Sequence, residues 1–154
     1  MCAIVDNCAF SQVFDQTNKN HGKFKPVRDW IVDGAGKIVY GGSKYARELK
    51  QGRRAKFLAE LSRRGKTVQM PTDKVDQTAG RLKKKVPEDA FDDEHIVALV
   101  IVSKCRIVCT GDGRSLPYLK RRDLYPTGVK RPKVYSSARN ADLCCPRNVI
   151  DICR

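Results

Sequence analysis

Four carboxylic acids stand where predicted strands end or helices begin: Asp6, Glu48, Asp93 and Asp112. The first follows the apolar segment 3–5, and the last follows the apolar segment 106–109 after a Thr-Gly turn. The other two lie at or in helices next to predicted strands. Because binding sites in open parallel sheets lie at the carboxyl ends of the strands, we expect the four acids to meet at one edge of the sheet.

Carboxylates held close together repel one another unless a cation neutralises them. Oxygen ligands suit Mg²⁺ and Mn²⁺. One such ion activates water for attack on phosphorus, and a second stabilises the leaving oxygen. The acids therefore indicate metal-dependent hydrolysis of a phosphodiester.

Each acid also has an ordinary structural interpretation. Asp6 is suited to an Asx turn, Asp93 to a helix N-cap, and Asp112 to a turn with its two flanking glycines. Glu48 is suited to an ion pair with a Lys or Arg of its own helix. Taken one at a time, these interpretations are the commoner ones, so the case for a site depends on the four acids occurring together.

The charge of the chain indicates the partner. It has 31 Lys and Arg against 17 Asp and Glu, a formal net charge of +14. A positive field of this size attracts polyanions, so nucleic acid is the expected partner and an acidic protein the second choice. The candidate contacts with nucleic acid are Arg53, Arg54, Arg114, Lys120 and Arg121.

The hydrophobic pattern alternates between short strands and helices. Strands are predicted at residues 3–5, 38–40, 67–70, 106–109 and 133–135. Helices are predicted at residues 9–17, 26–31, 43–49, 53–64, 72–85, 92–103, 116–121 and 138–145. This alternation predicts an α/β fold, with a mostly parallel central sheet and helices on both faces, in a single domain covering 1–154.

The order of the four acids resembles that of the PIN family of nucleases over about residues 2–136. The matching motifs are Ile4-Val5-Asp6-Asn7, Ser43 followed by Glu48, Asp93 before an apolar helix, and Thr110-Gly111-Asp112. We choose Asp93 over Asp92 as the third acid because Ile96, Val97 and Val100 follow it at helical spacing. Many members carry another acid where this chain has Gly113 to Leu116, and the cysteine-containing extension 137–154 lies outside the resemblance.

The resemblance implies a PIN-like fold and a metal-dependent endoribonuclease, with DNA left open as a substrate. Asp6, Glu48, Asp93 and Asp112 would hold Mg²⁺ or Mn²⁺, and Asn7, Thr110 and Ser43 would orient them. Many small members are toxins of toxin–antitoxin pairs and often dimerise, so an acidic antitoxin protein and a homodimer are expected partners.

Two other functions compete with the nuclease. One is a non-catalytic, PIN-like module that binds nucleic acid. The other is a phosphatase on an unrelated doubly wound sheet, which is disfavoured because Asp6-Asn7-Cys8 lacks the second acid of an Asp-x-Asp loop.

The two histidines are assigned no catalytic role. His21 lies in a polar segment, and His95 is expected on a helix surface beside the acids. Trp30 and Tyr45 are assigned to the core rather than to stacking on bases.

The seven cysteines are expected to be free thiols because their number is odd and a cytosolic context is expected. A zinc site made of Cys144, Cys145, Cys153 and a distant histidine is the alternative. The longest apolar run, residues 96–102, is too short to span a membrane. The start of the chain lacks the basic region of a signal peptide, so a cytoplasmic location is expected.

Overall fold

A five-stranded sheet crosses the middle of the computed structural model, which describes residues 1–154. Its strands are β1 (Cys2–Val5), β2 (Lys37–Tyr40), β3 (Thr67–Gln69), β4 (Ile107–Cys109) and β5 (Lys133–Tyr135). The strand order is β3-β2-β1-β4-β5, and every neighbouring pair is parallel. The predicted α/β fold is confirmed, and the sheet is wholly rather than mostly parallel.

The two central strands are short apolar runs because both of their faces are covered. Every residue of β1 and of β4 is buried. Ile4 is in register with Val108, and Ala3 is in register with Ile38. The register places the carboxyl ends of β1 and β4 side by side.

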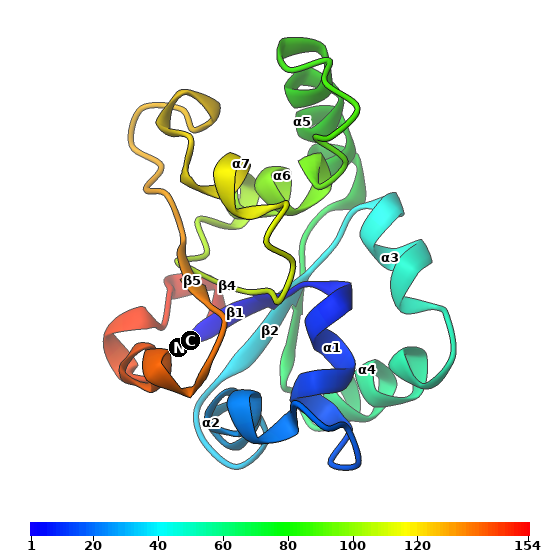
Figure 1. The fold of residues 1–154 in the computed structure, drawn as a ribbon, viewed down its shortest axis with the longest axis vertical. Coiled ribbons are helices and arrows are strands. Elements are labelled where there is room, and N and C mark those ends of the chain that lie inside the picture. Colours follow the sequence, from blue (N-terminus) through cyan, green and yellow to red (C-terminus); the bar gives the residue numbers. More distant parts are fainter.

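Helices cover both faces of the sheet. They are α1 (Asn7–Phe14), α2 (His21–Val32), α3 (Ser43–Leu49), α4 (Arg53–Arg63), α5 (Thr72–Lys85), α6 (Glu94–Ser103) and α7 (Leu116–Lys120). In Figure 1, α1, α2 and α4 lie on one side of the sheet and α5, α6 and α7 on the other. Short 3-10 helices follow at Arg122–Leu124, Ala138–Leu143, Pro146–Asn148 and Asp151–Cys153.

Helix α3 joins the two layers at the carboxyl edge of the sheet. It contacts α1 and α4 from one layer and α5 and α6 from the other. Its Tyr45 side chain is fully buried and donates a hydrogen bond to the carbonyl oxygen of Val5 at the end of β1. Tyr45 therefore belongs to the core, as predicted, and it fixes α3 beside the strand end.

The structure corrects three predicted helices. Helix α1 covers residues 7–14 rather than 9–17. Helix α2 begins at His21, so Pro26 lies inside it and does not open it. Phe24, Val27 and Ile31 bury one face of α2 at helical spacing, which outweighs the one backbone bond that a proline cannot donate. The predicted helix at 138–145 is a 3-10 helix that ends at Leu143.

The two ends of the chain lie together, as Figure 1 shows. A disulfide joins Cys2 in β1 to Cys153, and the other five cysteines are free. The expectation of seven free thiols is therefore wrong. The expectation was based on the odd count and on a cytosolic context. Neither observation shows that the fold brings two cysteines together from opposite ends of the chain. The indole nitrogen of Trp30 donates to the carbonyl oxygen of Met1 at 2.9 Å, which further anchors the start of the chain.

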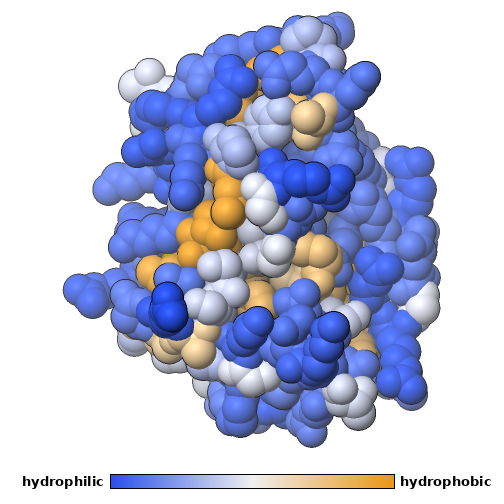
Figure 2. All heavy atoms as spheres, in the orientation of Figure 1, coloured by the Kyte–Doolittle hydropathy of each residue, from blue (hydrophilic) through white to orange (hydrophobic).

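The surface is mainly polar. Figure 2 shows hydrophilic residues over most of one face, with a strip of hydrophobic residues crossing it. None of the helices has the length and hydropathy needed to cross a lipid bilayer.

Candidate active site

The strand order reverses direction between β1 and β4. The chain proceeds from β1 to β2 and β3 on one side, then returns to β4 and β5 on the other. Such a switch point leaves a crevice outside the carboxyl ends of the two strands, where ligands of open α/β sheets bind. Asp6 directly follows β1, and Thr110 and Asp112 follow β4. The sequence therefore places two of the predicted acids at this crevice.

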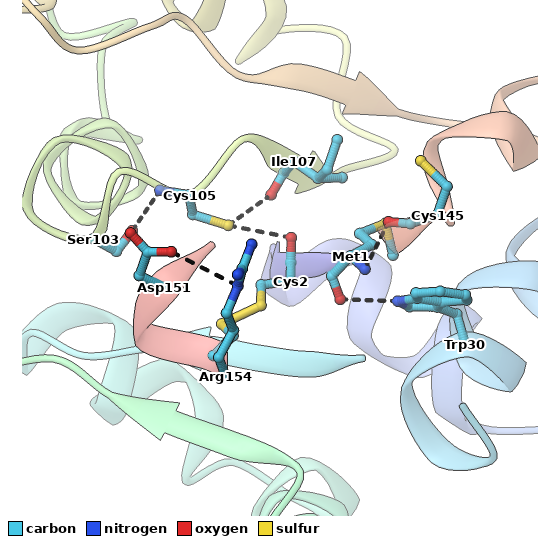
Figure 3. The surroundings of a disulfide bond; sticks show 10 residues. Met1, Cys2, Trp30, Ser103, Cys105, Ile107, Cys145, Asp151 and Arg154 are labelled. Atoms are coloured by element: carbon cyan, nitrogen blue, oxygen red, sulfur yellow. Dashed lines mark hydrogen bonds and ion pairs between the residues drawn. A yellow bond between two sulfur atoms is a disulfide. The ribbon is translucent and has the colours of Figure 1, made fainter. Parts of the chain in front are cut away.

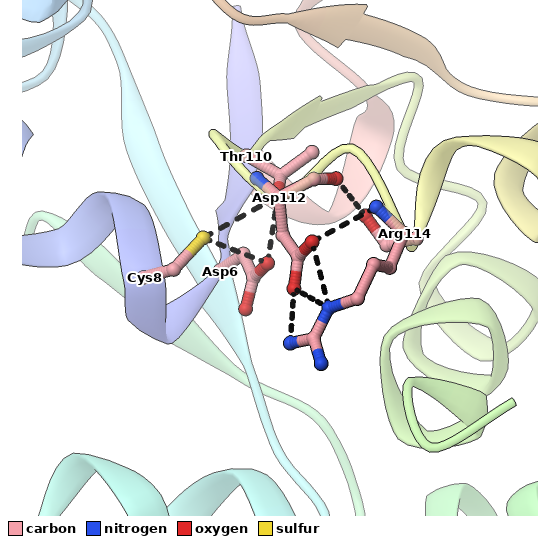
Figure 4. A network of polar contacts seen from close by, with 6 residues as sticks. Asp6, Cys8, Thr110, Asp112 and Arg114 are labelled. Carbon is pink, nitrogen blue, oxygen red and sulfur yellow. Dashed lines mark hydrogen bonds and ion pairs between the residues drawn. The ribbon is translucent and has the colours of Figure 1, made fainter. Parts of the chain in front are cut away.

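Asp6 is held by two side chains and is 7% exposed. The hydroxyl of Thr110 donates to its Oδ2 atom at 2.7 Å, and the thiol of Cys8 donates to the same oxygen at 3.2 Å (Figure 4). Burial first, and the Asp6 carboxylate second, raise the pKa of the Cys8 thiol, which keeps this donor protonated. Although Asp6 is the N-cap residue of α1, its side chain does not cap the helix.

Asp112 is paired with Arg114 in the turn after β4 (Figure 4). Its Oδ1 atom accepts the backbone N–H of Arg114 at 2.8 Å, and its Oδ2 atom lies 2.7 Å from a guanidinium nitrogen of the same residue. These bonds hold the pKa of Asp112 below its ordinary value. The turn foreseen as an alternative for Asp112 is therefore present, and Arg114 neutralises its charge.

Asp93 carries negative charge that no partner neutralises. It is the N-cap residue of α6, but its side chain does not cap the helix. Burial, followed by the charges of Asp6 and Asp92, raises its pKa to about 6. Asp92 is exposed, whereas Asp93 is half-buried. Of the two candidates for the third acid, Asp93 is therefore the less exposed.

Glu48 lies between the two helical layers. The side-chain amide of Asn7, on α1, donates to its Oε2 atom. The same oxygen is 3.4 Å from Nε2 of His95, on α6. The contact with His95 is the main cause that lowers the pKa of Glu48. The side chains that contact it thus come from other helices, and it forms no ion pair with a Lys or Arg of its own helix.

His95 is 3% exposed, so its predicted place on a helix surface is wrong. The prediction failed because α6 is buried over nearly all of its length, and a helix in that position has no free surface to offer. Both ring nitrogens of His95 lack a hydrogen-bond partner, as do Oδ1 of Asn7 and Oε2 of Glu94. Buried polar atoms are nearly always paired, so these four atoms are exceptions within this structure.

A second link attaches α3 to the start of α6. Lys44 forms an ion pair of 3.0 Å with Glu94, and its amine also donates to the carbonyl oxygen of Asp92. The segment that carries Asp92 and Asp93 is therefore tied to the helix that carries Glu48.

The acids fit a hard divalent cation in their chemistry. Asp6, Asp93 and Asp112 offer carboxylate oxygens, and neighbouring acids contribute to raising the pKa of Asp93. In this structure no three His, Cys, Asp or Glu side chains are gathered closely enough to enclose an ion. Glu48 is turned to Asn7 and His95, and Asp112 is turned to Arg114, so the four acids share one edge without forming one cluster.

The other predicted residues are dispersed. The backbone N–H of Ser43 donates to Asp76 at 2.8 Å and its hydroxyl donates to the same carboxylate, so Ser43 does not orient the four acids. Arg53 pairs with Asp15 at 3.6 Å, and Arg121 pairs with Asp123 at 2.9 Å. Arg54 lies on α4 and Lys120 ends α7, on opposite sides of the sheet.

Arg114 alone among the predicted nucleic-acid contacts touches a candidate acid. A pocket of about 420 Å³ opens beside it, lined by Asp89, Ala90, Asp92, Arg114, Pro117 and Tyr118. This pocket lies between the start of α7 and the segment that precedes α6.

Cys8, Lys44 and His95 are the residues that the sequence interpretation missed. Cys8 stands two residues after Asp6 in the first turn of α1, a spacing that could have suggested contact with the acid. Lys44 and His95 reach the site only through the packing of α3 on α6. Comparison with protein-family models, with curated proteins and with solved structures finds no match to this chain.

Proposed function

We propose that this protein is a metal-dependent endoribonuclease with its active site at the β1–β4 switch point. The observation that carries the proposal is the position of Asp93. Its half-buried carboxyl group lies near enough to the acids of the switch point for the charges of Asp6 and Asp112 to add to the main effect of burial, which together raise its pKa to about 6.

Asp6, Asp93 and Asp112 would hold the ion, with Glu48 at the border of the site. Bound Mg²⁺ or Mn²⁺ supplies an acidic water and positive charge for the phosphate oxygens. Thr110 and Cys8 fix the orientation of Asp6, because both donate to one of its oxygens and leave the other free. Asn7 donates to Oε2 of Glu48, and Nε2 of His95 lies 3.4 Å from the same oxygen.

Arg114 has two roles in this proposal. Without a bound ion it neutralises Asp112. Its side chain is 81% exposed, so once Asp112 turns to a cation the guanidinium is free to bind a phosphate oxygen of the substrate. The surplus of basic residues draws RNA to the crevice, and an acidic protein would be a natural inhibitor of such a surface.

The test is cleavage of a labelled, mixed-sequence RNA with Mg²⁺, with Mn²⁺ and with chelator. Asp6→Asn is compared with the control Asp142→Asn, which removes the same charge from an exposed position without an ion pair. The proposal expects metal-dependent cutting that Asp6→Asn lowers by more than about 100-fold, since even residues that only orient metal ligands contribute about 10- to 100-fold. Asp142→Asn should cut like the unchanged protein.

Two outcomes would overturn the proposal. Equal cutting by both variants would mean that the site lies elsewhere. Tight, salt-sensitive binding without cutting under any metal would favour the non-catalytic nucleic-acid-binding module. A matched DNA strand in the same assay decides whether the substrate class extends beyond RNA.

A further inference from the structure

A second pocket lies at the opposite edge of the sheet. We call it the amino-edge pocket, since it opens where strands β4 and β5 begin. It has a volume of about 500 Å³ and is formed by the end of α6, the segments before β4 and β5, and the C-terminal segment. Figure 3 shows Asp151 and Arg154 of this region beside Ser103 and the Cys2–Cys153 disulfide.

The amino-edge pocket is strongly positive. The cations that line it are Lys104, Arg106, Lys130, Arg147 and Arg154, and the only acid is Asp151. The ratio of basic to acidic residues in the pocket lining is therefore far higher than in the whole chain, which has 31 basic and 17 acidic residues. Of the five cations, Arg154 alone forms an ion pair, at 3.7 Å from Asp151. Four unpaired cations that repel one another therefore surround one hollow.

Ordinary structural causes explain only part of this arrangement. The carbonyl end of a helix favours a nearby cation, which accounts for Lys104 at the end of α6. Arg106, Lys130 and Arg147 come from three other segments and have no such partner. An anion bound between them would relieve their repulsion.

The pocket also has an apolar wall, made of Val102, Val149, Ile150 and Ile152. Ile152 is 43% exposed and is the large hydrophobic side chain that the fold leaves uncovered. The volume lies within the range of about 300–1,000 Å³ that small-molecule sites have. An apolar wall beside a ring of cations suits a ligand with an anionic group and a flat or apolar part.

We propose that the amino-edge pocket binds a nucleotide unit, with its phosphate among the cations and its sugar and base against the apolar wall. A phosphate offers several oxygens at once, and the planar guanidinium groups of arginine bind such oxygens in pairs. The unit comes either from a free nucleotide or from a strand of nucleic acid. The C-terminal segment, which the resemblance leaves unexplained, supplies two of the arginines and most of the wall.

The test measures binding of two probes in chelator: adenosine monophosphate by calorimetry, and a short labelled single strand by fluorescence anisotropy. Arg106→Gln combined with Arg147→Gln is compared with Lys74→Gln combined with Lys84→Gln. The control pair removes the same charge from exposed positions on α5 that line no part of the pocket. Chelator prevents metal-dependent cutting, so the result stands apart from the proposed nuclease activity.

The arginine variant should weaken binding by at least about 10-fold, the usual effect of losing hydrogen bonds to a charged group. The slope of log affinity against log salt should fall by roughly 0.7 for each strand phosphate that the protein no longer neutralises. The control should change affinity by less than about 2-fold, because only the general field is reduced. Weaker binding of both probes identifies the nucleotide unit itself as the ligand, whereas weaker binding of the strand alone identifies the backbone.

Three results would overturn the proposal. Equal weakening by both variant pairs would mean that only the overall charge matters. Binding of neither probe would mean that the pocket is no phosphate site. A poly-glutamate peptide that binds as tightly as the strand, with the same dependence on the two arginines, would assign the pocket to acidic proteins instead.

Discussion

The hydroxyl of Thr110 donates a hydrogen bond of 2.7 Å to Oδ2 of Asp6, across 104 positions of sequence. The same hydroxyl oxygen accepts the backbone N–H of Asp112 at 3.0 Å. Thr110 thereby couples the acid after β1 to the acid after β4. Thr110 is 1% exposed and Asp6 is 7% exposed. Water therefore cannot easily take the place of the Thr110 hydroxyl, and loss of this hydrogen bond would leave a buried carboxylate oxygen with a partner missing.

Thr110→Val keeps the shape of the side chain and removes both hydrogen bonds. The rate of RNA cleavage should fall by about 10- to 100-fold, because Asp6 loses the donor that orients it. The free energy of unfolding should fall by about 1–3 kcal/mol, because a buried carboxylate loses a partner. Cleavage assays and urea denaturation measure the two effects.

Thr110→Ser is the matched control for this prediction. It retains the hydroxyl and should restore most of the activity, although it removes a methyl group from the core. If the valine variant cuts as fast as the unchanged protein, the Thr110 hydrogen bond does not position Asp6 for the reaction.

Asp93 makes the stability depend on pH in a direction unusual for a carboxylate. Its pKa is about 6 in the folded chain, against an ordinary value of 3.8. Between these two values the folded chain binds more protons than the unfolded chain, so the free energy of unfolding falls as the pH rises. The penalty is complete above about pH 6.

Asp93→Asn should therefore stabilise the metal-free protein above about pH 6 and have little effect below pH 3.8, where the acid is protonated in both states. Urea denaturation in chelator on either side of this interval measures the change. The same variant should lose cleavage. A variant that is less stable than the unchanged protein above pH 6 would show that Asp93 has a favourable partner in the folded state.

The general position of the candidate site could be predicted from the sequence because it depends on local features. Short apolar runs such as 3–5 and 107–109 form strands, and parallel strands bring the residues that follow them to one edge. Asp6 and Asp112 were therefore expected together, and they flank the same crevice. Helix α5 was predicted with its observed bounds, Thr72–Lys85, because the segment is polar and ends in three lysines, which suit the end of a solvated helix.

The pairing of side chains could not be predicted because it depends on how helices pack. Glu48 contacts Asn7 and His95 only because α3 bridges the layers formed by α1 and α6. The pattern of polar and apolar residues along one helix does not indicate which side chains of other helices it will contact. The predicted start of α2 at Pro26 was wrong for a related reason. Burial of one face of α2 outweighs the local preference of proline for the first turn of a helix.

The contact between His95 and Glu48 should contribute to stability. His95→Phe keeps a ring of similar size but removes the nitrogen that lies 3.4 Å from Oε2 of Glu48. We expect the free energy of unfolding at neutral pH to fall by about 1 kcal/mol, a low value because the Glu48 side chain is 34% exposed. Urea denaturation of the variant and the unchanged protein measures the difference.

The stabilisation that comes from the Glu48 carboxylate should depend on pH. The folded-state pKa of Glu48 is below its ordinary value of 4.5, so its stabilisation is present above pH 4.5 and is lost as the pH falls through the folded-state value. The deficit of His95→Phe should therefore shrink in acid. A double variant with Glu48→Gln separates the contact from general packing, and strictly additive effects of the two substitutions would argue against the contact.

The Cys2–Cys153 disulfide should stabilise the fold and retain the C-terminal segment. It closes a loop with a sequence separation of 151, so it greatly restricts the unfolded chain. We expect Cys153→Ser to lower the free energy of unfolding by about 2–4 kcal/mol, and a reductant to do the same to the unchanged protein. Cys144→Ser alters a free thiol, and the stability of this variant should still fall when reductant is added, whereas that of Cys153→Ser should not change.

Alkylation of the denatured, non-reduced protein followed by mass measurement counts the free thiols directly. Seven modified thiols would show that the bond is absent, and five would confirm it.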